Sequence, residues 1–493
     1  MNLEEAPLKR IRDNLLANRD DYGEIYLSGG YVRDYLLQKE NNDLDFSVTR
    51  NAAKAARRIA DLFSGDFYML DHYRETARAL INVDQTCIVI DVALISGKNI
   101  NEDLAKRDFT INAMAVDLSD LHKIMDPLDG RTDLIKRQLK PCSENSFSDD
   151  PIRTLRAVRF IRSLSLDYDL KIKNAICNIA QQLKSVSGER IRDELGHIFN
   201  LPEIRKSIEL LAEFNLFKQL FPDLIKLEEI LPRPPHIHNA FIHTMRVVEL
   251  TQLLNVSINT FSNPSENNFI NNALTLVGKY KKGLMKYLDD FADRKISMTP
   301  LMILAALYHD SGKAYIVPIE EGEKFTYPNH AEKSTQIVHE RMKSLAFSNE
   351  EIQFVDSVIR HHMDDELKTI GDGENPNRYI YRYFRQTGNS GIEIGFLHLA
   401  DLIATYEQTL SPLRWSTALK SVEKLLDAWI NHYTEVISPP RLINGNDLME
   451  KFGLQPGKEI GGILEQVREE QAAGIILERN AAFGFAEKII KGN

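Results

Sequence analysis

The sequence has few cysteines and no pattern that would link them. Only Cys87, Cys142 and Cys177 occur in 493 residues, and no two are spaced as a CxxC pair. A zinc ribbon, a thioredoxin-like redox site and a disulfide framework are therefore excluded. So little cysteine is typical of a reducing compartment, and we expect a cytoplasmic protein.

Long apolar runs and an excess of positive charge are also missing. No uncharged apolar stretch approaches the ~18 residues that a membrane span needs, and residues 1–21 lack the apolar core of a signal peptide. Lys and Arg number 61 against 71 Asp and Glu, a formal net charge of −10. That balance excludes a protein that grips nucleic acid over its whole surface but allows a local basic groove. We expect neither membrane nor DNA as a partner.

The patterns along the chain change from mixed strands and helices to helices alone. Residues 1–140 alternate short apolar runs with helical spacing, and residues 77–95 favour a hairpin, which predicts an α+β head built on a small mixed sheet. From about Phe147 the period is helical, so the remainder is predicted to be all-α. A proline-rich stretch places a boundary near residue 232, and residues 255–272 are predicted to form an exposed polar loop. The expected regions are 1–140, 141–232, 233–435 and a helical tail, 436–493.

Acidic residues in the head have the spacing of a cation site. Asp43 and Asp45 lie at i and i+2 of a predicted strand, so both point to one face. Carboxylates grouped this way suit a divalent cation such as Mg²⁺, although such a pair is also common in a polar turn. Asp91 stands in an apolar strand and either completes a three-carboxylate site or lies on an exposed edge. Gly29 and Gly30, between a strand and a helix, could admit phosphate oxygens.

Five short motifs follow one another along the chain. They are SGGYVRDYLLQ with DLDFSV, AKRDFTINAMA at 105–115, DPLDGRTDL at 126–134, SDDPIRTLRAVRF, and SGERIRDEL. In this order they resemble the motifs of the class II tRNA nucleotidyltransferase and bacterial poly(A) polymerase family. The resemblance implies a polymerase-β-like head that transfers nucleotides from CTP and ATP to an RNA 3′ end, such as the tRNA acceptor end.

The resemblance implies a role for each matching residue. Asp43 and Asp45 match the residues that bind the catalytic metal, and we expect Asp91 to join them. The nucleotide would be bound by three sets: Gly29, Gly30 and Arg33 at the triphosphate; Lys106, Arg107 and Asp108 at the sugar; Asp150 and Arg153 at the base edge.

Three departures from the family pattern bear on nucleotide choice. Lys106 replaces the usual arginine and loses its planar fork, and Asp149 replaces the usual glutamate. Residues 92–105 are short where CCA-adding members often carry a longer flexible loop. A CC-adding enzyme is therefore an open alternative.

Residues 150–192 carry nine basic side chains against four acidic ones. These basic residues could simply lie on solvent-exposed helix faces. However, few of them have an acidic residue at i+4 to form an ion pair, which favours a groove that faces RNA phosphates. Shape and backbone would then be recognised, as expected for A-form RNA. We expect Arg156 and Arg159 near the nucleotide, and Arg162, Arg190 and Arg192 on the RNA.

A second set of residues follows the order H…HD…H…HH…D: His243, His309 with Asp310, His330, His361 with His362, and Asp401. This order resembles the HD phosphohydrolase superfamily. The resemblance implies a metal-dependent phosphodiesterase or phosphatase, with a divalent transition metal or Mg²⁺. His309 and Asp310 are adjacent, so both reach one metal only near a helix end or from a distorted turn. Lys313 could contact a phosphate, and His398 is taken as structural. The implied ligands are His243, His309, Asp310 and Asp401, with His330 and either His361 or His362 as additional positions.

Three functions remain open on the sequence. The first is addition of C and A, or of C alone, to tRNA 3′ ends by a chain that also carries a hydrolase. The second is a poly(A) polymerase. The third is a hydrolase whose head only binds RNA, which the intact DxD and Lys-Arg-Asp motifs disfavour. The oligomeric state, the hydrolase substrate and the role of residues 255–300 are not predicted.

Overall fold

The computed structural model describes residues 6–83, 86–259, 265–289, 296–321 and 324–492. The chain forms two compact units. One unit is Met1–Val186 with Glu213–Leu216, and the other is Ser187–Ala212 with Phe217–Asn493. The boundaries expected near residues 140 and 232 lie inside these units.

The first unit contains the predicted mixed sheet. Its strand order is β3-β4-β5-β2-β1-β6-β7, with β2 and β5 parallel and the other neighbours antiparallel. The predicted hairpin is confirmed as β4 and β5. The strands are β1 (Ile25–Ser28), β2 (Asp43–Val48), β3 (Asp66–Asp71), β4 (Thr76–Val83), β5 (Thr86–Leu94), β6 (Ala115–Asp117) and β7 (Asp120–Met125).

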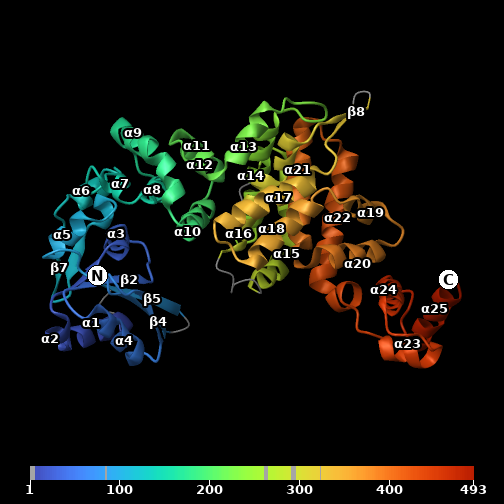
Figure 1. Ribbon diagram of the computed structural model, residues 1–493, viewed down its shortest axis with the longest axis horizontal. Helices are drawn as coiled ribbons and strands as arrows, with labels where there is room; N and C mark the ends of the chain where they lie inside the picture. The colour runs from blue at the N-terminus through green and yellow to red at the C-terminus, as the bar shows by residue number, and fades with distance from the viewer. Residues whose placement is uncertain (1–5, 84–85, 260–264, 290–295, 322–323, 493) are drawn as a thin grey trace. The chain divides into compact units, whose positions relative to one another are not determined.

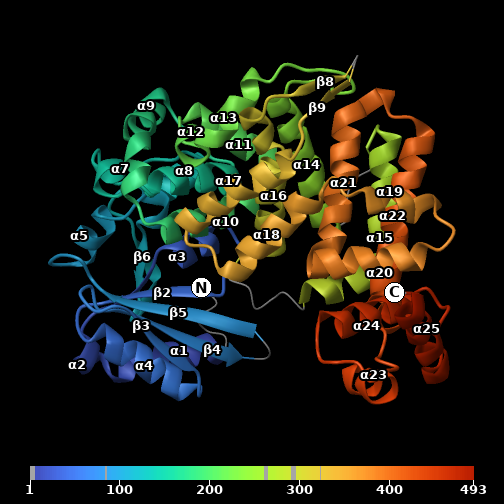
Figure 2. The same cartoon turned by 45° about the vertical axis from the view of Figure 1, so that its right-hand side comes forward.

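Alternation along these strands separates a core face from an open face. Alternate strand residues such as Leu44, Ala79 and Ile90 are fully buried. They pack with Ala56 and Ile59 of the amphipathic helix α4, and α1 and α4 lie on the same side of the sheet (Figure 1; Figure 2). The residues between them point to the opposite face, which carries Asp43, Asp45 and Asp91.

Helices complete the first unit. The segment from Phe147 onward is helical, as the sequence predicts. The helices are α1 (Ala6–Ala17), α2 (Arg19–Tyr22), α3 (Gly30–Leu36), α4 (Ala52–Leu62), α5 (Ile100–Ala105), α6 (Gly130–Ile135), α7 (Ser146–Asp149), α8 (Arg153–Leu164) and α9 (Leu170–Ile179), with 3₁₀ turns at Thr110–Asn112 and Ala180–Ser185.

The second unit is almost entirely helical, apart from the short hairpin β8 (Ile319–Glu321) and β9 (Lys324–Thr326). Its helices are α10 (Gly188–Phe199), α11 (Ile204–Glu213), α12 (Phe217–Leu220), α13 (Pro222–Ile225), α14 (Ala240–Ser257), α15 (Asn268–Asp289), α16 (Met298–Tyr308), α17 (His330–Ser344), α18 (Asn349–His361), α19 (Asp365–Asp372), α20 (Pro376–Thr387), α21 (Gly391–Tyr406), α22 (Pro412–Asn431), a π-helical turn (Tyr433–Ile437), α23 (Gly445–Phe452), α24 (Lys458–Ala472) and α25 (Arg479–Gly492).

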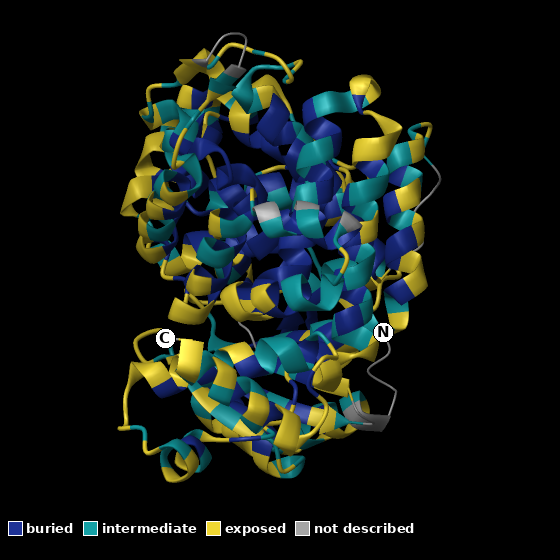
Figure 3. Ribbon diagram, turned by 90° about the vertical axis from the view of Figure 1, so that its right-hand side faces the viewer, coloured by how far each residue is buried: buried dark blue, intermediate teal, exposed yellow. Residues whose placement is uncertain are grey.

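Helix α16 lies at the centre of this unit. Its apolar residues are buried all round, which is why the segment lacks the polar face of a surface helix. Buried residues concentrate in the interior of the helical unit (Figure 3). In the described part of the chain, no helix is long and apolar enough to cross a membrane.

The predicted polar loop at 255–272 is shorter than expected. Helix α14 continues to Ser257 and α15 begins at Asn268. Residues 260–264, in the middle of this segment, lie outside the described residues.

Candidate functional site

The turn between β1 and α3 favours glycine at its first position. Gly29 has φ +76°, a backbone conformation that strains other residues. A Cβ atom there would lie 2.8 Å from Nη1 of Arg107 and 3.0 Å from Oδ2 of Asp45, so these two side chains would have to move. The turn therefore lies directly beside Asp45, as the nucleotide-site prediction requires.

The sheet register brings the three predicted carboxylates together. Asp45 of β2 is the direct neighbour of Asp91 of β5, and Asp43 is two residues away on the same face. Burial raises the pKa of Asp45 to about 6; Arg107 opposes this shift, while Asp91 and Asp43 add to it. Burial, and the repulsion from Asp91 and Asp43, favour a proton on Asp45, and a bound cation would replace that proton.

Asp91 already has a partner that the sequence analysis missed. Arg78 of β4 stands opposite Asp91 and donates to both of its oxygens, Nε to Oδ1 at 2.8 Å and Nη2 to Oδ2 at 2.9 Å. This pairing could have been predicted from the sequence, because the expected hairpin places an arginine of one apolar strand opposite an aspartate of the next. Asp91 is thus oriented by Arg78 beside the pair on β2.

The segment Lys106-Arg107-Asp108 is held by hydrogen bonds on both sides. Lys106 donates to the Ser96 carbonyl at 3.0 Å, and Arg107 donates to Oγ of Ser28 at 2.7 Å. Burial works to raise the pKa of Asp108, but Arg156 outweighs it and holds that pKa below its usual range.

Helix α8 supplies the arginines that hold this segment. Nε and Nη2 of Arg156 lie 2.8 and 2.6 Å from Oδ2 of Asp108. Arg153 donates to the carbonyl oxygens of Arg107 at 3.2 Å and Lys106 at 2.9 Å. The half-buried Asp150 directly follows α7. The structure thus places Arg153 and Arg156 against the segment Lys106-Arg107-Asp108.

Three predicted nucleotide-binding arginines gather around one aromatic ring. The guanidinium carbons of Arg33, Arg156 and Arg159 lie 5.2, 5.5 and 4.6 Å from the ring centroid of Phe160. Arg33 also donates to Oδ1 of Asn112 at 2.6 Å. Arg33 and Arg156 are also ion-paired, with Asp34 and Asp108, so the ring and the carboxylates together hold these guanidinium groups in place.

The predicted RNA-binding arginines do not all lie at a surface. Arg162 is half-buried near the end of α8, and Arg190 is exposed on α10. Arg192 is only 5% exposed and donates to Asp193 and to the carbonyl oxygen of Ala346. The expectation that Arg192 faces RNA is therefore wrong for this structure, because its guanidinium supports packing within the second unit.

The second unit brings the HD residues to one centre. His243 comes from α14, and Asp401 comes from α21. Helix α16 ends at Tyr308, so the next two residues, His309 and Asp310, occupy the distorted turn that the sequence analysis required. His330 begins α17, and His362 directly follows α18.

Asp310 is shared between two groups of potential ligands. His243, His309 and Asp310 form one group, and Asp310, His330 and His362 form the other, with the ligand atoms of each group within 4.8 Å of one another. Nε2 of His309 lies 3.4 Å from Oδ2 of Asp310, and Nε2 of His330 lies 3.3 Å from Oδ1. Each carboxylate oxygen thus faces a different group.

Asp401 completes the set at the first group. Its Oδ1 lies 3.0 Å from Nε2 of His243 and 3.8 Å from Nε2 of His309. Between the two adjacent histidines, it is His362 that joins the centre, with Nε2 3.9 Å from Asp310. His361 instead has Nδ1 3.7 Å from Asp364, so its assignment as a metal ligand is not supported.

The imidazole rings are oriented as metal ligands usually are. Nδ1 of His309, His330 and His362 each donates to the carbonyl oxygen three residues earlier, at 2.8, 2.8 and 2.6 Å. That bond fixes the tautomer and turns the unprotonated Nε2 toward the centre. Nε2 of His243, His309 and His330 is buried and faces the carboxylates of Asp401 and Asp310. A divalent cation would satisfy these atoms, so the residues fit a metal centre.

The charges at the centre also fit a cation. Burial works to raise the pKa of Asp401, but His243 outweighs it and the pKa stays well below the usual range. Burial lowers the pKa of His362 to about 3. Burial also works to lower the pKa of His309, but Asp310 outweighs it and that pKa is raised. Asp401 is therefore ionised and His362 neutral, which are the forms that bind metals.

Two cavities reach this centre. One of about 350 Å³ is lined by Arg233, Phe325 and His330, and the other, of about 760 Å³, by Asp401, Tyr406 and Arg414. Both are also lined by Asp310, Lys313 and His236. Nζ of Lys313 lies 2.6 Å from Oδ2 of Asp310, at the edge of the predicted phosphate site. His398, taken as structural, lines the larger cavity.

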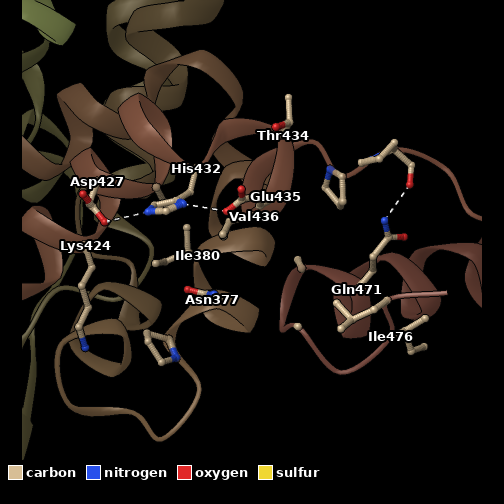
Figure 4. A pocket seen from close by; sticks show the side chains of 17 residues that line it. Asn377, Ile380, Lys424, Asp427, His432, Thr434, Glu435, Val436, Gln471 and Ile476 are labelled. Atoms are coloured by element: carbon tan, nitrogen blue, oxygen red, sulfur yellow. Dashed lines mark hydrogen bonds and ion pairs between the residues drawn. The ribbon is translucent and has the colours of Figure 1, made fainter. Parts of the chain in front are cut away.

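A further cavity of about 710 Å³ lies between α20, α22, the π-helical turn and the end of α24 (Figure 4). Its main polar groups are bonded within the protein. Nδ1 of His432 lies 2.8 Å from Oε2 of Glu435, and Lys424 donates to the carbonyl oxygens of Ile370 and Gly371. We assign no function to this cavity.

Family models match three stretches of the chain. Residues 25–140 match "Poly A polymerase head domain", residues 167–227 match "Probable RNA and SrmB- binding site of polymerase A", and residues 329–483 match "tRNA nucleotidyltransferase domain 2 putative". The first covers the sheet with the carboxylates.

Two named relatives resemble this chain along nearly its full length, and a third resembles less than half of it. An A-adding tRNA nucleotidyltransferase of Deinococcus radiodurans is 25% identical over 94% of each chain. A CC-adding tRNA nucleotidyltransferase of Synechocystis sp. is 25% identical over 94% of this chain and 93% of the relative. A CC-adding enzyme of Geobacter sulfurreducens is 38% identical over 40% of this chain and 45% of the relative.

Solved structures share the fold. A CCA-adding enzyme in complex with CTP has a TM-score of 0.59 at 22% identity, covering 98% of this chain and 95% of that one. The Thermotoga maritima CCA-adding enzyme complexed with tRNA has a TM-score of 0.55 at 22% identity, with the same coverage. Fold and head motifs define a nucleotidyltransferase class of protein. Within it, family models for the poly(A) polymerase head and for tRNA nucleotidyltransferase domain 2 each match part of the chain, and relatives named as tRNA nucleotidyltransferases resemble it along most of its length.

Proposed function

We propose that this chain is a template-independent RNA nucleotidyltransferase that adds C and A to tRNA 3′ ends from CTP and ATP. The observation that carries the proposal is the grouping of Asp43, Asp45 and Asp91 beside the Gly29 turn. Three carboxylates on an accessible sheet face suit nucleotidyl transfer, in which the RNA 3′-hydroxyl attacks the α-phosphate of the nucleotide and pyrophosphate leaves.

The head residues fit Mg²⁺ as the catalytic metal. Asp43 and Asp45 supply oxygen ligands on one face, and Asp91 stands beside them. When bound, such ions stabilise charge on the attacking and leaving oxygens. Gly29, Gly30 and Arg33 would face the triphosphate.

Selection of the incoming base by Asp150 and Arg153 requires that Arg153 has an N–H group available to donate to the base. Both Nη atoms of Arg153 already donate, to the carbonyl oxygens of Lys106 and Arg107 and to Ser146. To read a base edge, Arg153 can use its Nε–H or the second hydrogen on Nη2, or exchange one of these bonds. Lys106, Arg107 and Asp108 would contact the sugar beside it.

A CC-adding enzyme is the second candidate. The relatives from Deinococcus and Synechocystis, similar along most of the chain, are named A-adding and CC-adding tRNA nucleotidyltransferases. The short segment between β5 and α5 is also held by hydrogen bonds, unlike a long flexible loop. The Ser96 amide donates to Asp103 at 2.7 Å, and the Lys98 amide donates to Glu102 at 3.0 Å.

The deciding experiment is end addition to three tRNA transcripts, lacking CCA, CA or A. CTP and ATP are supplied separately and together with Mg²⁺, and products are read at single-nucleotide resolution. Completion of all three to CCA, followed by a stop, is the expected result. A halt after CC establishes the CC-adding enzyme, and processive addition of A indicates a poly(A) polymerase. No incorporation with several tRNAs contradicts the proposal and leaves the head as an RNA-binding unit.

The second unit supports an additional metal-dependent phosphohydrolase activity. His243, His309, Asp310 and Asp401 would hold one divalent ion, and His330 and His362 with Asp310 a second. Bound metal supplies a hydroxide nucleophile at neutral pH and polarises the phosphate. Lys313, at the wall of both cavities, would neutralise phosphate charge. Phosphate esters at RNA ends, cyclic phosphates included, are the proposed substrates.

Adjacent histidines give a matched pair of variants for this activity. His362→Ala is expected to lower bound metal, measured by elemental analysis, and the hydrolysis of RNA-end phosphate esters in Mn²⁺, Ni²⁺ or Mg²⁺. His361→Ala should retain both, because its ring faces Asp364. Equal losses in the two variants, or no metal in the wild type after metal supplementation, would contradict the assignment.

A further inference from the structure

One row of side chains links the edge of the sheet to the carboxylates. Tyr68 of the edge strand β3 stands opposite Arg78, Arg78 stands opposite Asp91, and Asp91 is beside Asp45. Directly paired residues share a face of the sheet. Because neighbouring strands lie ~4.8 Å apart, Tyr68 is about 10 Å from Asp91 on the same open face.

The edge of this face is apolar and accessible. Tyr68 is 49% exposed and Leu70 is 48% exposed, whereas Phe67 and Met69, between and beside them, pack against the core on the other face. Leu80 and Val89 continue the open face as the neighbouring pair of β4 and β5. An accessible aromatic and aliphatic strip on an edge strand invites unwanted pairing, so its presence calls for an occupant.

The charges along the row favour the end of an RNA strand. Arg78, 40% exposed, lies between Tyr68 and Asp91 and offsets the charge of Asp91. The hydroxyl to be extended must reach Asp43 and Asp45. Tyr68 lies three strands from Asp45, ~14 Å away on the same face, so a base near the 3′ end of the RNA can lie over it. Aromatic rings bind unpaired bases by stacking, with little dependence on sequence.

We propose that Tyr68, with Leu70, Leu80 and Val89 around it, is a stacking platform for the unpaired 3′-terminal bases of the RNA being extended. This inference rests on the proposed nucleotidyl transfer. Tyr68 is a positioning residue: it holds the base so that the 3′-hydroxyl lies at the carboxylates. The platform tolerates a change of base at the growing end, because every base has a face that can stack.

The test uses the full chain with Tyr68→Ala, Tyr68→Phe and Tyr68→Leu. A tRNA transcript lacking CCA is extended with CTP, and KM for tRNA, KM for CTP and kcat are determined. Tyr68→Ala should raise KM for tRNA roughly tenfold, within the range of a lost base stack, and leave KM for CTP within about twofold. Tyr68→Phe should match the wild type, and Tyr68→Leu, which keeps apolar bulk, should resemble Tyr68→Ala. Tyr433→Ala, a tyrosine of similar exposure in the second unit, serves as the control.

A second measurement separates stacking from a structural effect. The same transcripts are made with an abasic 3′-terminal nucleotide, and binding is measured by fluorescence anisotropy without nucleotide. Loss of the base should weaken binding to the wild type and to Tyr68→Phe but change nothing further in Tyr68→Ala, because each change removes the same contact. Additive losses, or an unchanged KM for tRNA in Tyr68→Ala, would overturn the platform.

Failure of the proposed function would look different. If the wild type incorporates no nucleotide on any transcript, nucleotidyl transfer is rejected, and the anisotropy measurement still decides whether Tyr68 binds the RNA end. A third result is possible: the wild type extends RNA, but Tyr68→Ala raises the KM for tRNA and for CTP and also lowers the midpoint of thermal unfolding. Tyr68→Leu then separates a lost base stack from a damaged fold. If Tyr68→Leu has wild-type KM values, apolar bulk is sufficient and stacking is rejected.

Discussion

The carboxylate of Asp108 is buried, and one arginine carries most of its compensation. Arg156 approaches Oδ2 with two nitrogens, while Asn112 and the Phe109 amide donate to Oδ1. A buried charge is tolerated only when it is paired and fully hydrogen-bonded. The pair therefore ties α8 to the segment that is proposed to contact the sugar.

Arg156→Met should destabilise the first unit by about 3 kcal/mol, because Asp108 remains buried without its cation. Stability can be followed by hydrogen exchange of peptides from residues 6–186 during denaturation of the full chain. Lys171→Met is the contrasting variant, since Lys171 and Glu144 form an exposed ion pair that is expected to contribute nothing measurable. Equal stability of Arg156→Met and the wild type would show that Asp108 is not held by this charge.

At the scale of helices and strands, patterns in the sequence predict much of the structure. Alternation predicts the hairpin of β4 and β5, and the helical period predicts α8, α9 and α10. The requirement that His309 and Asp310 leave a regular helix is met, because α16 ends at Tyr308. These features depend on local spacing, which the sequence displays directly.

Pairings between distant segments are what local patterns miss. Arg192 belongs to a basic series, but its guanidinium bonds to Ala346, 154 residues away. Arg153 is likewise directed at the backbone of residues 106 and 107. The choice between His361 and His362 also depended on the direction in which α18 ends. A basic residue indicates that charge is present, whereas its partner is set by the tertiary fold.

The whole molecule carries its two candidate centres in separate units. The carboxylates of the head belong to the unit Met1–Val186, and the histidine centre belongs to the unit that begins at Ser187. None of the side chains that form the second centre comes from the first unit. Each centre is therefore formed by residues of one unit only. A substitution at one centre should leave the side chains of the other centre in place.

Asp45→Ala and Asp310→Ala should consequently have opposite effects on the two activities. Asp45→Ala should abolish nucleotide addition to tRNA and retain hydrolysis of phosphate esters, because the histidine centre keeps all its ligands. Asp310→Ala removes the carboxylate shared by both groups of ligands, so it should abolish hydrolysis and metal binding in the second unit while addition continues. Both activities are measured on one preparation of each variant, with folding checked by circular dichroism. Loss of both activities in a folded Asp45→Ala protein would mean that one centre serves both reactions, and the division of labour between the units would have to be abandoned.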